Sequence, residues 1–257
     1  MNCGTDNTFM VGYLLLPIST IVFLAYFCKA TTGFGSSLIM MSIGSLLIGP
    51  APALILTTQL DVIGGAALLR IDPTEDDRRL WLPLSVAMIA GVVIGGILLN
   101  EIGLKHIQHV VALFLLSVGV WLLLARSRTG TGSLQTKLPD RFKLGDGAVC
   151  LIAGLCGGLS GLSGAPVLFY FSRKLAKEPL RRILTRIFLA EAIARLMVYL
   201  LLGMVHWSTI ITGLLCMPVM GLGLYVGNHA FFKTSEVWYT RFTGVISIGA
   251  ALRLLFR

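Results

Sequence analysis

The chain has 257 residues, of which 56% are apolar and 13% are charged, and its mean hydropathy is +0.86. Soluble domains carry about 25% charged residues, so the composition excludes a soluble enzyme or binding module. It indicates an all-α, polytopic membrane protein with a single transmembrane domain over residues 1–257. The net charge of +9 lies in short loops between apolar segments, which favours orientation in a membrane over nucleic-acid binding.

Apolar segments recur along the whole chain, and about 20 such residues span a bilayer core. In chain order they are Phe9–Cys28, Ser36–Gly49, Ala53–Leu69, Trp81–Leu99, Ile107–Ala125, Ala148–Phe171, Ile183–Gly203, Ser208–Asn228 and Val237–Phe256. The second segment has 14 residues, which give about 21 Å of helix against a core of about 30 Å. It is therefore predicted to be the return limb of a hairpin that ends in a turn at Pro50–Pro52.

Lysine and arginine mark the cytoplasmic loops of membrane proteins. Five basic residues precede the segment 148–171 and five follow it, so a single crossing would leave one basic loop outside. A re-entrant hairpin that turns at Gly157–Gly164 keeps both loops inside. Full crossings remain the alternative for the segments 9–49 and 148–171. With the loops placed by charge, the N-terminus is expected in the periplasm of a bacterial inner membrane.

The two halves of the chain match at a constant shift of 128 residues. The shift maps Gly33 onto Gly161, Thr57 onto Thr185, Asn100 onto Asn228 and Lys105 onto Lys233. A duplication is therefore predicted, with repeat 1 at about 9–126, a linker at about 127–143 and repeat 2 at about 144–257. The charge pattern gives the repeats opposite orientations, each with a broken or re-entrant helical hairpin and three transmembrane helices.

Two stretches inside apolar sequence concentrate residues that interrupt a helix, Lys29–Ser37 and Cys156–Pro166. At membrane depth the freed backbone groups must line a cavity or be buried in protein. A helix that restarts there directs unpaired N–H groups into the cavity and favours an anion. Ser36 and Ser37 are predicted to cap one restarting helix and Ser163 the other. The alternative is that the glycines only allow helices to cross closely.

Ionisable residues inside membrane segments are functional candidates by default. Lys29 precedes the first break, where its ammonium would attract an anion; otherwise it snorkels or pairs with Asp61. Asp61 either neutralises Lys29 or carries a coupling proton. Glu191 and Arg195 are four residues apart on one helix and are expected to pair. Arg186 lies about 140° round that helix from Glu191, so it is freer to contact a ligand.

An intramembrane serine hydrolase is the enzymatic alternative. Gly158–Gly161 and Gly161–Gly164 both fit the GxSG nucleophile motif, with Ser160 or Ser163 as the nucleophile. That chemistry needs a base within hydrogen-bond reach of the serine, and the histidines fall at segment ends. We therefore expect no enzyme, and neither a cofactor nor a metal site is predicted.

The two breaks carry related glycine patterns, Gly33–Ser36 and Gly161–Gly164, each followed by a short helix and a helix bearing threonine. In these features the chain resembles, over nearly its whole length, the TauE/SafE family of sulfite exporters and organosulfur-anion permeases. The family's G-x-G-G pattern has one glycine replaced by serine in each copy. The family's Thr-Ser pair looks like Thr57-Thr58, and its second copy departs from the pattern by an arginine, Arg186, that would add positive charge.

These observations and the resemblance lead to the hypothesis of a secondary transporter that exports a small sulfur oxyanion, sulfite or an organosulfonate, by alternating access. The residues predicted to bind the anion between the breaks are Lys29, Thr31, Gly33, Gly35, Ser36, Ser37, Thr57, Thr58, Gly161, Ser163, Gly164, Ala165 and Arg186. Charge balance or proton coupling is expected from Asp61, Gln59, Glu191 and Arg195. The expected partners are the anion and the lipid bilayer. A homodimer is left open, and a channel for anions or solutes with the same fold is the alternative.

Overall fold

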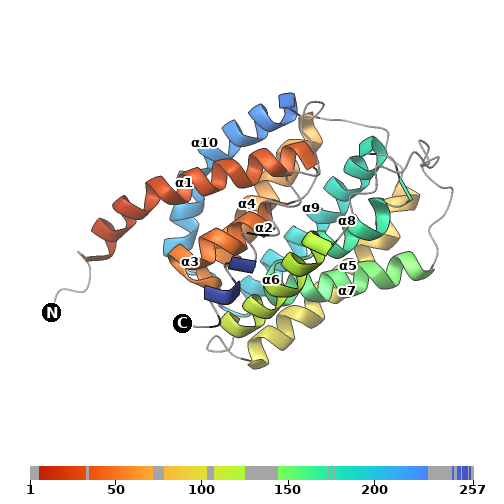
Figure 1. The fold of residues 1–257 in the computed structure, drawn as a ribbon, viewed down its shortest axis with the longest axis horizontal. Helices are drawn as coiled ribbons and strands as arrows, with labels where there is room; N and C mark the ends of the chain where they lie inside the picture. Colours follow the sequence, from red (N-terminus) through yellow and green to blue (C-terminus); the bar gives the residue numbers. More distant parts are fainter. Residues whose placement is uncertain are drawn as a thin grey trace.

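A computed structural model of the protein describes residues 6–32, 35–71, 78–102, 107–124, 144–172, 174–175 and 177–230, with a few positions of 245–255. It is all-α, as the composition predicts (Figure 1). The helices are α1 (Asp6–Thr32), α2 (Ser36–Ile39), η1 (Met40–Gly44), α3 (Ser45–Ile48), α4 (Pro50–Ile71), α5 (Arg78–Ile102), α6 (Ile107–Leu124), α7 (Leu144–Ser160), α8 (Gly164–Ser172), α9 (Lys177–Leu201) and α10 (Trp207–Ala230). The predicted linker and most of the predicted last segment lie outside the described residues.

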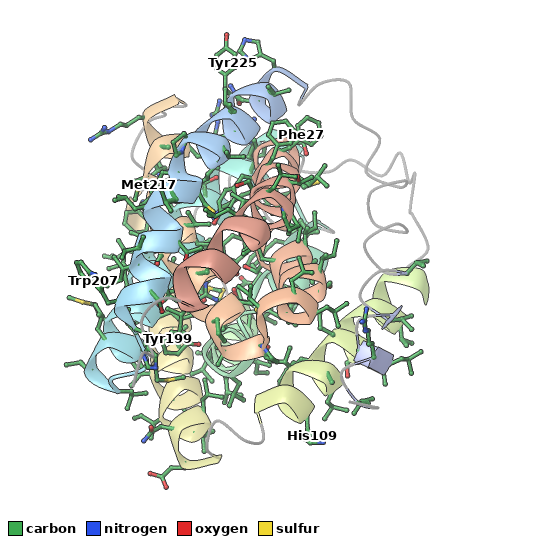
Figure 2. The ribbon with its side chains drawn as sticks, turned by 90° about the vertical axis from the view of Figure 1, so that its left-hand side faces the viewer. Phe27, His109, Tyr199, Trp207, Met217 and Tyr225 are labelled. Carbon is green, nitrogen blue, oxygen red and sulfur yellow. The ribbon has the colours of Figure 1, made fainter. Side chains whose placement is uncertain are left out.

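Three helices in the described part of the chain are long and apolar enough to cross a membrane, at Pro50–Arg70, Trp81–Glu101 and Trp207–His229. Most of their exposed side chains are apolar, and Figure 2 shows Trp207 and Tyr225 near opposite ends of α10, pointing away from the bundle. Both rings are largely exposed, at 74% and 62%. Eighteen residues of helix separate them by about 27 Å, close to a bilayer core of about 30 Å. This spacing suits aromatic residues at the two membrane interfaces.

Helices from the two halves pack against one another in a reciprocal pattern. The helix α1 lies along α10, α7 lies along α5, and α4 and α9 pack together between these pairs (Figure 1). The predicted shift of 128 residues relates α1 to α7 and α5 to α10, so the first helix of each half packs on a later helix of the other. Opposite membrane orientation of the halves stays a prediction.

Both predicted helix breaks occur where the glycines lie. The helix α1 ends at Thr32 and α2 begins at Ser36, while α7 ends at Ser160 and α8 begins at Gly164. After the second break the chain reverses direction. The ammonium of Lys174, just beyond α8, lies 2.5 Å from a carboxylate oxygen of Asp146 in the first turn of α7. The segment is therefore a hairpin whose two ends lie side by side, as predicted.

The turn predicted at Pro50–Pro52 is wrong. The helix α4 already begins at Pro50, and the chain reverses one residue earlier, at Gly49, whose φ of 88° favours glycine. Proline is tolerated in the first turn of a helix because the N–H it lacks has no partner there. The prolines therefore start α4 instead of separating it from the hairpin.

Candidate anion site

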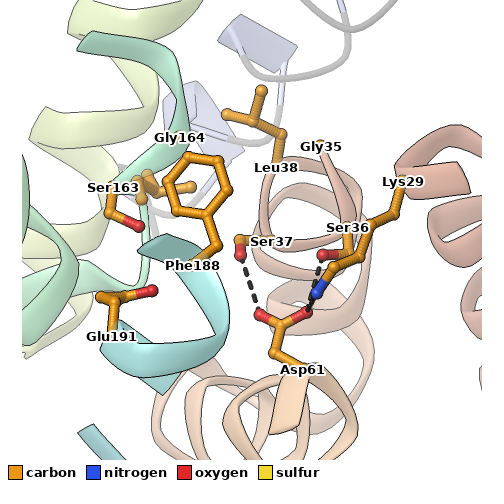
Figure 3. Close-up of a pocket in the computed structure, with 11 residues that line it drawn as sticks. Lys29, Gly35, Ser36, Ser37, Leu38, Asp61, Ser163, Gly164, Phe188 and Glu191 are labelled. Atoms are coloured by element: carbon orange, nitrogen blue, oxygen red, sulfur yellow. Dashed lines mark hydrogen bonds and ion pairs between the residues drawn. The ribbon is translucent and has the colours of Figure 1, made fainter. Parts of the chain in front are cut away.

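One buried pocket lies between the two breaks. Its lining comes from the end of α1, both breaks, α4 and α9: Lys29, Gly35, Ser36, Ser37, Leu38, Asp61, Leu162, Ser163, Gly164, Phe188 and Glu191. Figure 3 shows Lys29, Ser36 and Asp61 on one side and Ser163 and Glu191 on the other. The cavity volume is about 20 Å³, which is room for about one water. In this conformation the pocket is therefore closed to an anion with several heavy atoms.

The first break is shaped by Gly35. Its φ of 103° lies in the left-handed region that favours glycine, and it occupies the N-cap position of α2 without any side-chain capping bond. The prediction that Ser36 and Ser37 cap this helix is wrong. Their hydroxyls instead donate to the carboxylate of Asp61 on α4, over 2.7 Å and 3.2 Å. The break thus places two hydroxyl donors in the pocket.

The carboxylate of Asp61 is the centre of the site. Beside the two serine hydroxyls, it accepts hydrogen bonds from the Tyr26 hydroxyl at 3.0 Å, the Lys29 ammonium at 2.6 Å and the Arg195 guanidinium at 3.2 Å. Asp61 and Lys29 are each 5% exposed and Arg195 is fully buried. A buried charge is tolerated only when it is paired and hydrogen-bonded. This network meets that condition for Asp61 with five donors.

The second break brings a serine and a glutamate to the opposite wall. Gly161 has a φ of 76° and ends α7, and Ser163 hydrogen-bonds Glu191. Gly157 in α7 lies close to both Ser163 and Glu191. A Cβ atom there would lie 2.8 Å from Oε1 of Glu191 and 2.8 Å from Cβ of Ser163. Only glycine leaves room for this contact between the hairpin and α9.

Four charges form one chain across the site. Lys29 pairs with Asp61 at 2.6 Å, Asp61 with Arg195 at 3.2 Å, and Arg195 with Glu191 at 3.2 Å. The predicted pair of Glu191 and Arg195 is confirmed. The two positive and two negative charges cancel, which an apolar interior requires. The ion pair between Oε1 of Glu191 and Nη1 of Arg195 is not aligned as a hydrogen bond. These two atoms and Nε of Arg195 are buried without a hydrogen-bond partner among the described residues.

Several predicted binding residues do not line this pocket. The hydroxyls of Thr31, Thr57 and Thr58 donate to carbonyls one helical turn earlier in their own helices, over 2.6 to 3.0 Å. These bonds satisfy the hydroxyls within the helix. The amide of Gln59 faces α10, since its Oε1 would lie 2.7 Å from a Cβ built on Gly213.

The remaining predictions fall at the edge of the site or outside it. Arg186 lies on α9 and does not line the pocket, and Gly161 shapes the second break without lining it. Ala165 lies in the first turn of α8, directly after the lining residue Gly164. Gly33 lies outside the described residues.

Sequence reasoning missed Tyr26 and Phe188. Tyr26 is fully buried in α1 and bonded to Asp61, and Phe188 on α9 lines the pocket. In an apolar helix an aromatic residue carries no signal of its own. Tyr26 is three residues before Lys29, hence on the same face of the helix. That spacing is the one feature that marks it.

The two serines of the GxSG motifs, Ser160 and Ser163, form hydrogen bonds with groups other than histidine. The Ser160 hydroxyl donates to the carbonyl of Cys156 at 2.8 Å, and Ser163 bonds Glu191. His206 and His229 lie on exposed surfaces, whereas both serines are buried. Within the described residues neither serine is paired with a histidine base, so the geometry gives no support to the hydrolase alternative.

The chain is similar to known proteins over most of its length. A family model described as "Sulfite exporter TauE/SafE" matches residues 18–254. A protein of Cupriavidus necator described as "Probable sulfite/organosulfonate exporter TauE" is 24% identical over 258 residues, which cover 95% of this chain and 97% of the relative. No solved structure matches the chain.

Proposed function

Because this chain belongs to the TauE/SafE family of sulfite exporters, we propose that it is a secondary transporter that exports a small sulfur oxyanion. Its relative in Cupriavidus necator is described as a sulfite/organosulfonate exporter, which supports sulfite or an organosulfonate as the substrate. The observation that carries the proposal is the convergence of two helix breaks, a lysine and two serine hydroxyls on one buried pocket.

The anion would bind between the breaks. The Lys29 ammonium and the hydroxyls of Ser36 and Ser37 would bind its oxygens from one side. The Ser163 hydroxyl and the free N–H groups at the start of α8 would bind from the other, since helix N-termini favour negative charge. The apolar part of an organosulfonate would lie against Phe188, which lines the same pocket.

The small size of the pocket supports transport by alternating access. With room for about one water, the present conformation corresponds to a closed form of the carrier. The two hairpins would separate toward one side of the membrane and then the other to admit and release the anion. Asp61 and Glu191 are the candidates for coupling this cycle to protons, because they are the acidic residues of the pocket lining.

We place the protein in the inner membrane of a bacterium, with its N-terminus in the periplasm. The proposed halves have opposite orientations in the bilayer, as the distribution of basic residues predicts. The reciprocal packing of α1 on α10 and of α7 on α5 supports two structurally related halves. Inverted repeats of this kind place the substrate near the midplane, at their interface.

Transport by the purified protein tests the proposal. In proteoliposomes loaded with radiolabelled sulfite or ethanesulfonate, efflux should saturate with substrate concentration and should be inhibited by the other anion. Empty liposomes provide the control. Efflux that rises linearly with concentration would indicate a channel of the same fold, and no efflux of either anion would contradict the proposed substrate class.

A further inference from the structure

The carboxylate of Asp61 already accepts hydrogen bonds from the donors that a substrate anion would need. Lys29, Ser36 and Ser37 are the pocket-lining residues that present positive charge or hydroxyls from the first break, and all three bond the carboxylate of Asp61 over 2.6 to 3.2 Å. A carboxylate and a sulfonate accept the same kind of charge-assisted hydrogen bond. Asp61 therefore competes with any anion that enters the pocket.

Charge balance adds a second constraint. In the closed form Lys29 and Arg195 neutralise Asp61 and Glu191, so the site has no net charge. Adding a sulfonate alone would leave one uncompensated negative charge in a buried site, which is strongly unfavourable. A single proton on either carboxylate restores neutrality.

Of the two acids, Asp61 is the one whose protonation frees the donors. Glu191 bonds Ser163 and pairs with Arg195, and neither bond engages Lys29 or the first-break serines. A proton on Glu191 would leave Asp61 holding these donors. A proton on Asp61 removes the charge that holds Lys29, Ser36 and Ser37, and these groups can turn to the substrate.

Resting on the proposed function, we infer that the substrate is a monoanion, a sulfonate or hydrogensulfite, which binds together with one proton that Asp61 takes up from water. The proton forms an O–H bond on the Asp61 carboxylate, and the site stays neutral before and after binding. Binding of the proton and binding of the anion strengthen each other equally, as linkage requires. A dianion such as sulfate would need a second proton.

The groups that face Asp61 come from three elements. Tyr26 and Lys29 lie on α1, Ser36 and Ser37 on α2, and Arg195 on α9, with Glu191 behind it. On α10, Cys216 lies near the Tyr26 ring. Among the described residues of this network, the two carboxylates are therefore the groups that the variants below test as the source of the linked proton.

The test measures the affinity of the detergent-solubilised protein for methanesulfonate by calorimetry between pH 6 and pH 8. This probe stays ionised throughout, so any pH dependence belongs to the protein. The affinity should fall by about tenfold for each pH unit, as expected for one linked proton. Repeating the titration in buffers of different ionisation enthalpy should give an uptake of about one proton per bound anion. Sulfate should bind at least about tenfold more weakly.

Asp61→Asn removes the negative charge of the side chain and keeps its shape. Its affinity for methanesulfonate should be independent of pH and, at pH 8, higher than that of the wild type. Glu191→Gln should retain the pH dependence. Asp146→Asn, which breaks the pair with Lys174 outside the pocket, should match the wild type. Size-exclusion profiles identify any variant that does not fold. In that case the number of protons that the wild type takes up per bound anion decides whether the inference holds.

Different results separate the two proposals. Binding by the wild type without pH dependence or proton uptake would overturn this inference and leave the proposed function standing. The same holds if Glu191→Gln, and not Asp61→Asn, removes the pH dependence. If methanesulfonate, ethanesulfonate and sulfite all fail to bind at any pH, the proposed function falls and this inference with it.

Discussion

Replacing Lys29 with methionine should reduce sulfite or sulfonate efflux in proteoliposomes by about a hundredfold or more. The ammonium is the one cation among the described residues of the pocket lining, and it lies 2.6 Å from Asp61. Truncating one partner of a buried, hydrogen-bonded charge pair at a binding site costs about 2–5 kcal/mol of binding free energy, and each 1.4 kcal/mol is about tenfold in affinity. Efflux per folded protein, quantified after reconstitution, is the measurement.

Two further variants distinguish a binding role of Lys29 from a structural one. Lys174→Met removes a more exposed ion pair, 2.5 Å from Asp146 and outside the pocket, and should leave efflux close to that of the wild type. In the double variant Lys29→Met/Asp61→Asn both buried charges are gone, so thermal stability should recover while efflux stays absent. Normal efflux in Lys29→Met, or recovered efflux in the double variant, would remove Lys29 from the binding site.

The second large effect is expected for Gly157→Ala. The added methyl group would lie 2.8 Å from both Oε1 of Glu191 and Cβ of Ser163, closer than carbon atoms approach in packed proteins. Overpacking of this kind costs about 1–3 kcal/mol, and the strain falls on the contact between the second hairpin and α9. The melting temperature should therefore fall, and efflux should fall as well because Glu191 and Ser163 line the pocket.

Gly147→Ala in the same helix is the matched control. A Cβ atom at this position would meet nothing within 4 Å, and alanine favours a helix over glycine by about 1 kcal/mol. This variant should transport normally and melt at the same temperature or higher. Equal efflux for the two glycine variants would show that the fit of α7 against Glu191 and Ser163 does not matter for transport.

The sequence predicts the position of both breaks because several residues that interrupt a helix cluster at two places inside apolar sequence. Helix ends at Thr32 and Ser160 follow from them. The hairpin of residues 144–174 follows from basic residues on both sides of one apolar segment, and the bond between Asp146 and Lys174 agrees with it. These features depend on local composition and charge, which a single sequence contains.

The detailed geometry of the site depends on contacts between distant segments, and a single sequence does not contain them. Asp61 and Arg195 are 134 residues apart, and only the packing of α4 on α9 brings them together. The serines were expected to cap α2, but Gly35 takes that position and frees their hydroxyls for Asp61. The threonines of α4 bond their own helix because a buried hydroxyl without another partner donates to the preceding turn.

The central claim is that the two breaks together form the anion site. The most direct measurement is a structure of the protein with 2-bromoethanesulfonate, in which the anomalous signal of bromine locates the ligand. We expect the bromine peak beside Phe188, with the sulfonate between Ser36 and Ser163. A peak on the lipid-facing surface, or in a cavity that neither break lines, would contradict the claim.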